Sequence, residues 1–178
     1  AALGLQMQTW IPLAALVAAA CYVNRALLRS RERLLVERPY NAVASAIVII
    51  IAACLAPDDQ LGLAWFVIAL VFFEVGALTR VAEFRVHAYA GIGLALAAIF
   101  TVNVPAGPPY QWIVPAIASA LCYLFALRQV YGANTAPEGE RESVRISVSI
   151  PASLLTAIVV WMLVPANYLD LAWLALAF

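Results

Sequence analysis

Long apolar runs, separated by short polar or charged segments, dominate the chain. No Asp, Glu, Lys or Arg occurs in residues 1–24, 39–57, 88–127 or 146–169. A bilayer core about 30 Å thick requires about 20 apolar residues in a helix, so each run suits one membrane span and the longest suits two. The runs are continuously apolar and lack the two-residue alternation of barrel strands, so the pattern predicts helices.

The segments between the runs set the limits of the expected helices. Turns rich in Pro and polar residues, "APDDQ", "VPAGPPYQ" and "VPANY", alternate with the charged connections "RSRERLLVER", "RVAEFRVH" and "YGANTAPEGERESVR". Such turns end helices. The sequence therefore predicts an all-α integral membrane protein with six complete transmembrane helices and a truncated seventh that begins near residue 168. The expected spans are residues 9–28, 41–57, 61–79, 86–104, 111–130 and 146–164.

Composition supports a lipid environment. Hydrophobic residues make up 66% of the chain and charged residues 11%, whereas soluble domains carry about 45–50% and about 25%. The net charge is zero, so we expect no nucleic acid as a partner. The apolar composition leads us to expect membrane lipids and other integral membrane proteins as partners. The only histidine is His87 and no Cys-x-x-Cys occurs. One histidine cannot supply both axial ligands of a bis-histidine haem, so we expect no metal and no cofactor, and an interfacial position for His87.

The arginines indicate the orientation of the chain. All of the basic residues are arginines, and they lie in or beside the first, third and fifth connections: Arg25, Arg29, Arg31, Arg33, Arg38, Arg80, Arg85, Arg128, Arg141 and Arg145. Basic connections remain in the cytoplasm. The N-terminus is therefore expected outside and the Arg-rich loops inside.

The tryptophans predict the same orientation. Indole rings prefer the headgroup level of a membrane, because the ring is apolar and its N–H requires a partner. Every tryptophan falls near the outer end of an expected helix: Trp10, Trp65, Trp112, Trp161 and Trp173. We expect these residues at the interface opposite to the arginines.

The chain contains an internal repeat. Residues 44–69 align with residues 152–177 at a constant offset of 108 with ten identities, including Pro57 with Pro165. A weaker match, with one inserted residue, relates "WIPLAALVAAACY" to "WIVPAIASALCY". The repeat unit contains four helices, and an even number leaves both copies in the same orientation. We predict a parallel four-helix repeat, with a first unit in 1–109 and a partial second unit in 110–178. Convergent hairpin composition is the alternative.

Glu74 is the one carboxylate well inside an expected span. It lies about 9 Å from Arg80 along the helix, at 1.5 Å per residue. Charged groups at such depth usually face the helical bundle and form pairs. Arg25 lies at a similar depth and is the expected partner. Glu74 is either half of a structural pair, or a protonated acid, or part of a proton or substrate site.

Known catalytic motifs are missing from the sequence. It has no His-Glu-x-x-His, no Gly-x-Ser-x-Gly and no phosphate-binding glycine loop. We therefore expect a non-catalytic accessory subunit or scaffold of a membrane complex. The alternatives are a part of a transporter or lipid-handling protein that uses Glu74, and last a membrane enzyme.

The segment "LGLAWFVIALVFFEVGALTRVAEFRVHAYAGIGLALAAIF" (61–100) resembles the uncharacterised bacterial multi-pass membrane proteins of the domain of unknown function 2339 family. The pattern consists of Leu63-Ala64-Trp65, then Glu74, an inner turn with Arg80 and Arg85, and an Ala/Leu/Gly-rich return helix. The resemblance implies a long array of helices in the bacterial inner membrane, with no established activity. It also implies that the chain is a fragment of a longer protein.

Overall fold

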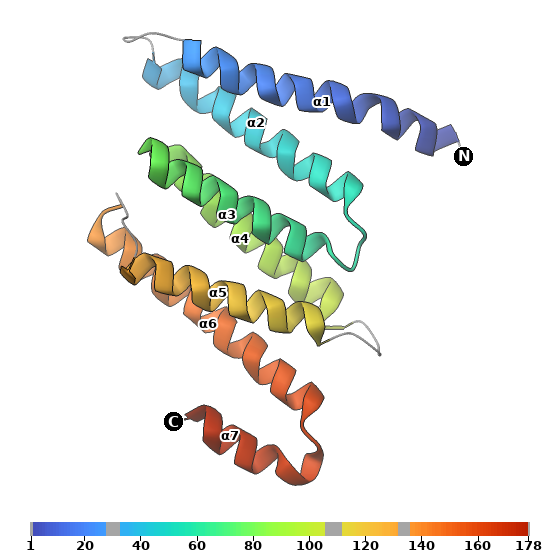
Figure 1. The fold of residues 1–178 in the computed structure, drawn as a ribbon, viewed down its shortest axis with the longest axis vertical. Coiled ribbons are helices and arrows are strands. Elements are labelled where there is room, and N and C mark those ends of the chain that lie inside the picture. Colours follow the sequence, from blue (N-terminus) through green and yellow to red (C-terminus); the bar gives the residue numbers. More distant parts are fainter. Residues whose placement is uncertain (1, 28–32, 106–111, 132–135, 178) are drawn as a thin grey trace.

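The fold was obtained as a computed structural model that describes residues 2–27, 33–105, 112–131 and 136–177, without the side chains of 2–9, 24–27, 33–40 and 177. These residues form helices joined by turns (Figure 1). The helices are α1 (Ala2–Leu27), α2 (Arg33–Leu55), α3 (Leu61–Thr79), α4 (Ala82–Ala98), α5 (Ile113–Tyr131), α6 (Glu138–Leu163) and α7 (Leu169–Ala177). A π-helical turn, η1 (Ile99–Asn103), extends α4, and a 3-10 turn, η2 (Ala166–Tyr168), precedes α7.

Among the described residues, four helices are long and apolar enough to cross a membrane. They cover Leu61–Thr79, Ala82–Asn103, Ile113–Tyr131 and Glu138–Leu163. The all-helical prediction is thus confirmed, and these helices overlap four of the expected spans. The apolar parts described for α1 and α2 are shorter. Six complete spans and a seventh therefore remain a prediction.

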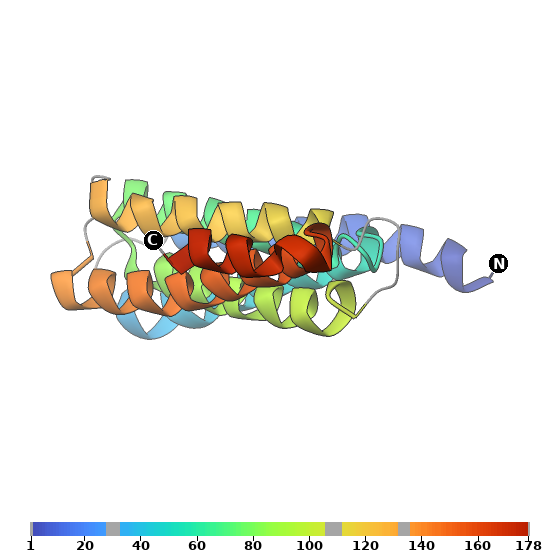
Figure 2. The same ribbon diagram turned by 90° about the horizontal axis from the view of Figure 1, so that it is seen from below.

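The helices pair into antiparallel hairpins that lie side by side in a row. Figure 1 shows α1–α2, α3–α4 and α5–α6 in succession, with α7 at the end of the row. Seen along the row in Figure 2, α3 and α5 lie in one layer and α4 and α6 in the other. Because every helix reverses the direction of the chain, α2, α4 and α6 run parallel to one another. Alternate connections therefore fall at the same end of the molecule.

The charged connections contain more helix than expected. α6 begins at Glu138 instead of residue 146, and α2 begins at Arg33 instead of residue 41. The reason is that hydropathy marks where a helix enters lipid, not where its backbone becomes helical. In α6, Glu138 and Glu140 occupy the first turn, where the helix dipole stabilises negative charge. The longer α6 brings Glu140 within reach of α4.

The two copies of the repeated turn have corresponding boundaries. α2 ends at Leu55 and α6 at Leu163, which is the same offset of 108 (163 − 55). The same backbone hydrogen bond closes both turns. The Gln60 N–H donates to the Pro57 carbonyl, and the Tyr168 N–H donates to that of Pro165, each at 2.9 Å. The division into units 1–109 and 110–178 stays a prediction that these matches favour.

Aromatic side chains fill the space between the middle and last hairpins. Phe66, Phe73 and Phe125 are almost fully buried. The rings of Phe73 on α3 and Phe125 on α5 meet edge to face, with centroids 4.8 Å apart. Gly91 lets α4 approach Ala69 closely, because a Cβ at Gly91 would lie 3.0 Å from the Cβ of Ala69. This packing sets the register in which polar groups of α3 and α4 meet α5 and α6.

The C-terminal end of α4 is joined to the turn before α3. Within η1, Asn103 is buried and its Nδ2 donates to the backbone carbonyl of Asp59 at 2.6 Å. A π-helical turn adds a residue to the helical ladder and so changes the direction in which the following side chains point. The hydrogen bond connects the α2–α3 turn to α4.

Candidate functional site

Within the described residues, contacts between polar side chains connect the α3–α4 hairpin to both of its neighbouring hairpins. Two of the connections are ion pairs to α5–α6. The third is a hydrogen-bonded chain to α1–α2. These connections are the candidate site, because polar groups within membrane spans are costly unless they are paired or functional.

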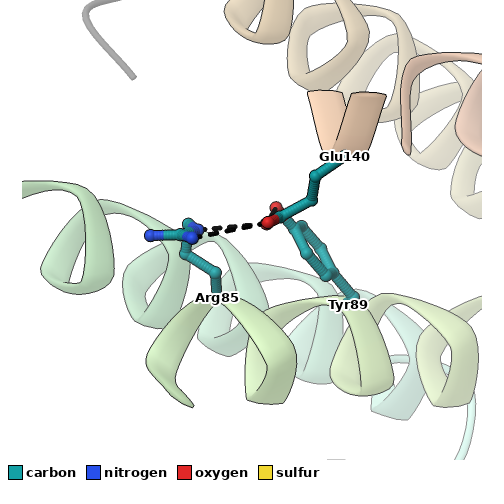
Figure 3. Close-up of polar contacts among 3 residues, drawn as sticks. All are labelled: Arg85, Tyr89 and Glu140. Atoms are coloured by element: carbon teal, nitrogen blue, oxygen red, sulfur yellow. Dashed lines mark hydrogen bonds and ion pairs between the residues drawn. The ribbon is translucent and has the colours of Figure 1, made fainter. Parts of the chain in front are cut away.

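The first connection, the α4–α6 cluster, consists of Arg85, Tyr89 and Glu140. Figure 3 shows Arg85 and Tyr89 on α4 reaching the carboxylate of Glu140 on α6. Arg85 Nε donates to Glu140 Oε1 at 3.1 Å and Nη2 donates to Oε2 at 3.4 Å. The Tyr89 hydroxyl donates to Oε1 at 2.9 Å. Arg85 and Tyr89 are four residues apart on one helix and therefore share a face.

Burial raises the free-energy cost of the charges in this cluster. The Arg85 side chain is 7% exposed and that of Glu140 is 31% exposed. A charge away from water is tolerated only when it is paired and its remaining hydrogen-bonding capacity is met. The two-pronged guanidinium and the tyrosine hydroxyl supply three donors to one carboxylate. The cluster therefore holds both carboxylate oxygens in fixed interactions and suits a structural connection.

The second connection pairs Glu74 on α3 with Arg128 on α5. Arg128 Nε donates to Glu74 Oε1 at 2.9 Å, and Nη2 donates to Oε2 at 3.1 Å. The two side chains are 30% (Arg128) and 47% (Glu74) exposed. Glu74 thus has an arginine partner, as expected for a carboxylate in a span. The side chain of Arg25 lies outside the described residues, so the predicted Glu74–Arg25 pair stays a prediction.

The third connection is a hydrogen-bonded chain through His87. His87 Nδ1 on α4 and Ser45 Oγ on α2 are 2.9 Å apart, and the Tyr22 hydroxyl on α1 is 3.3 Å from the same Oγ. Ser45 is 2% exposed. The predicted interfacial histidine therefore also makes an interhelical contact. Within the described part of the chain, no three His, Cys, Asp or Glu side chains gather to hold a metal ion.

The last hairpin, α5–α6, repeats one contact of the hydrogen-bonded chain through His87. The Tyr123 hydroxyl on α5 lies 3.1 Å from Ser153 Oγ on α6. Ser153 corresponds to Ser45 at the offset of 108, and Tyr123 corresponds to Tyr22 in the match of 112–123 with 10–22. The same tyrosine–serine contact therefore occurs in both hairpins, and in the first hairpin His87 of α4 also contacts the serine.

The tryptophans differ in their surroundings. Trp65 Nε1 donates to the Ile49 carbonyl at 3.0 Å, which fastens α3 to α2. Trp161 and Trp173 are exposed. Trp10 and Trp112 are half-buried. The exposed pair suits the predicted interfacial position, whereas Trp65 also has a packing role.

A groove of about 270 Å³ separates α4 from α6 next to the α4–α6 cluster. Its lining residues are Tyr89, Ile92, Gly93, Leu96, Ser143, Val144, Ser147 and Val148. Gly93 leaves it open, since nothing lies within 4 Å of the place that a Cβ would take. The groove is mostly apolar, with hydroxyl groups along one wall.

Sequence reasoning missed both ionic partners, Arg128 and Glu140. Arg128 was accessible in principle, since the predicted topology places it near the same end of the bundle as Glu74. No feature of the sequence pointed to Glu140 as an ionic partner, because the segment that contains it was expected to be a connection rather than a helix.

Comparison of the chain with known protein families, with curated protein sequences and with solved structures gave no match. The resemblance of residues 61–100 to the domain of unknown function 2339 family therefore stays a prediction.

Proposed function

We propose that this chain is a non-catalytic, multi-pass membrane scaffold or accessory subunit, whose helices pack against other integral membrane proteins. One observation carries the proposal. The carboxylates of Glu74 and Glu140 are each held by an arginine of a neighbouring hairpin, with two nitrogen–oxygen contacts in each pair.

Paired carboxylates of this kind favour assembly over proton transfer. A proton relay requires a group that gains and loses its proton during turnover. In each pair the arginine contacts both carboxylate oxygens, so both oxygens are engaged in a fixed hydrogen-bond arrangement. The two pairs thus serve best as fixed connections between hairpins.

The proposed topology has six complete spans and a truncated seventh in the bacterial inner membrane. The N-terminus lies outside and the Arg-rich loops lie in the cytoplasm. The alternating direction of the helices supports this topology, because it gathers the arginine-rich connections at one end and the tryptophan-bearing helix ends at the other. The exposed positions of Trp161 and Trp173 also support it.

The proposed architecture is the parallel four-helix repeat. Corresponding helix ends, corresponding turn hydrogen bonds and the shared tyrosine–serine contact support it. A repeated unit that adds hairpins along a row suits a scaffold, because each hairpin offers its outer face to the next.

Replacement of Glu74 by Gln tests the proposal. We expect Glu74→Gln to fold, to insert, and to remain in the same detergent-extracted assembly as the wild type, as judged by native mass spectrometry. Proteoliposomes with a pH-sensitive dye should show no proton flux that depends on Glu74. A flux that the wild type supports and Glu74→Gln abolishes would contradict a scaffold and favour a proton-coupled transporter.

Lipid handling is a second candidate that the groove between α4 and α6 favours. A groove at membrane depth with an apolar floor and hydroxyl groups on one wall suits an acyl chain and its ester region. Phospholipid that stays with the purified wild type and is lost from Gly93→Leu would support this candidate. Equal phospholipid in both proteins would favour the scaffold.

A further inference from the structure

The groove between α4 and α6 opens away from α3. Gly91 on α4 faces α3, because a Cβ at Gly91 would lie 3.0 Å from the Cβ of Ala69. Gly93, which lines the groove, is two residues further along α4 and is therefore rotated by about 200° from Gly91. In Figure 2, α3 and α5 lie in one layer and α4 and α6 in the other. The opening thus points across the row of hairpins, so its exposure does not depend on how many hairpins the row contains.

Two serine hydroxyls on the α6 side of the groove are available to a ligand. Ser143 and Ser147 line the groove, are exposed, and lie one helical turn apart, about 6 Å along the axis. Within the described part of the chain, neither hydroxyl has a hydrogen-bond partner. By contrast, the Ser149 hydroxyl on the same helix donates to the Arg145 carbonyl at 2.8 Å. A hydroxyl that faces hydrocarbon gains stability when it meets an acceptor.

The depth of these serines matches the ester region of a bilayer. Ser147 is the second residue of the expected span 146–164, and Ser143 lies three residues before the start of that span. Ile92, which also lines the groove, lies well inside the expected span 86–104. Hydroxyl groups therefore lie where the hydrocarbon begins, and apolar side chains continue towards the middle of the bilayer. A diacyl phospholipid has the same order of groups, with two ester carbonyls between its headgroup and its acyl chains.

The groove has no charge with which to recognise a headgroup. None of the described residues that line it is an Asp, Glu, Lys or Arg. The α4–α6 cluster borders the groove through Tyr89, but its two charges, on Arg85 and Glu140, are paired with each other. Phosphate is bound best by arginine or lysine, whereas a serine hydroxyl can donate a hydrogen bond to a carbonyl oxygen. The lining therefore favours the ester groups of a lipid over its headgroup.

The size of the groove favours a lipid chain over a helix. Its volume of about 270 Å³ corresponds to roughly nine groups the size of a water molecule, at about 30 Å³ each. This space suits part of one acyl chain. A helix with its side chains is about 10 Å across, so it could place no more than a side chain in the groove.

We propose that the groove between α4 and α6 holds one diacyl phospholipid by its ester carbonyls, which accept hydrogen bonds from Ser143 and Ser147. One acyl chain then lies between α4 and α6, and the headgroup makes no selective contact. This inference rests on the lipid-handling candidate described above and adds which part of the lipid is recognised.

Competition between ester-linked and ether-linked lipids tests the proposal. An ether-linked phosphatidylcholine keeps the headgroup and the chains but lacks both carbonyl acceptors. The full chain is reconstituted in nanodiscs that contain equal amounts of the two lipids, and native mass spectrometry identifies the lipid that stays bound. We expect the wild type to retain the ester-linked lipid in roughly two- to tenfold excess. In a mixture of ester-linked phosphatidylcholine and phosphatidylglycerol, the two lipids should be retained equally.

Serine variants connect the preference to the groove. Ser143→Ala combined with Ser147→Ala should retain the ester-linked and ether-linked lipids equally. Ser149→Ala is the matched control and should keep the wild-type preference, because its hydroxyl is already engaged within α6. Equal retention by the wild type, an unchanged preference in the double variant, or a preference for the anionic headgroup would each overturn ester recognition.

Gly93→Leu separates this inference from the candidate function on which it rests. The leucine side chain has room to enter the groove, since nothing lies within 4 Å of the Cβ position at Gly93. If Gly93→Leu loses the lipid but the wild type shows no ester preference, the inference fails and lipid handling remains. Equal lipid in Gly93→Leu and the wild type would remove both. Loss of a copurifying protein instead of a lipid would place a partner protein at the groove and overturn the proposal.

Discussion

Two ion pairs join the α3–α4 hairpin to the α5–α6 hairpin. Both pair an arginine with a glutamate, but they differ in burial, in which hairpin carries the arginine, and in the number of donors. In the α4–α6 cluster, Arg85 belongs to the middle hairpin and is nearly buried, and Tyr89 contributes a third donor. In the other pair, Glu74 belongs to the middle hairpin and is half exposed, and Arg128 is its partner. The same guanidinium–carboxylate contact thus occurs in two settings within one interface.

The surroundings of an ion pair, more than its geometry, decide how much stability its loss removes. An exposed arginine that loses its partner can turn its long side chain towards the headgroups. A buried arginine cannot do so and keeps an unmet charge. We therefore expect the α4–α6 cluster to dominate the connection between these hairpins.

Removal of the partner of the buried arginine should have the largest effect. Glu140→Ala leaves the buried Arg85 without its charged partner, and we expect the free energy of unfolding to fall by about 3–5 kcal/mol. Unfolding in mixed micelles with increasing dodecyl sulfate measures the change. Arg145→Ala, which breaks an exposed ion pair within α6, is the control and should leave the unfolding curve in place. Equal losses in the two variants would contradict the role of burial.

Loss of the tyrosine hydroxyl should have an intermediate effect. Tyr89→Phe removes one hydrogen bond to a carboxylate and keeps the ring, so we expect a loss of about 1.5 kcal/mol. A double-mutant cycle with Glu140→Gln isolates the contact, since the tyrosine substitution should cost less once the carboxylate is gone. Full additivity of the two substitutions would show that the hydroxyl acts elsewhere.

Exchange of the charges in the exposed pair should have the smallest effect. In Glu74→Arg combined with Arg128→Glu the two charges still meet, and we expect stability within about 1 kcal/mol of the wild type. The equivalent exchange of Arg85 and Glu140 should remain strongly destabilised, because a glutamate at 85 is too short to replace the guanidinium beside Tyr89. If both double variants recovered a similar stability, the proposed difference between the two ion pairs would be contradicted.

Where a helix begins after a Pro-containing turn, its start was predictable from the sequence. α3 occupies the expected residues 61–79, and α7 begins at Leu169, close to residue 168. Both follow a turn in which proline removes a backbone donor, so the local signal is strong. The extension of α6 to Glu138, ahead of the expected span 146–164, was not predictable from hydropathy, because a charged residue outside the apolar segment can still be helical.

The ion pairs were predictable only in part. Depth along the span indicated that Glu74 requires an arginine, but several arginines lie at the same end of the molecule. The choice of Arg128 depends on which hairpins are adjacent and on how Phe73 meets Phe125. That register arises from packing between segments more than fifty residues apart, which no local pattern encodes.

The hydrogen bond from Asn103 to the Asp59 carbonyl has a mechanical consequence. It joins the end of α4 to the turn that precedes α3, at the end of the hairpin opposite to Arg85. The two helices of the middle hairpin are thus connected at both ends, by the short turn between Thr79 and Ala82 and by this hydrogen bond. Separation of α3 from α4 would have to break the bond, so we expect the hairpin to move as one unit.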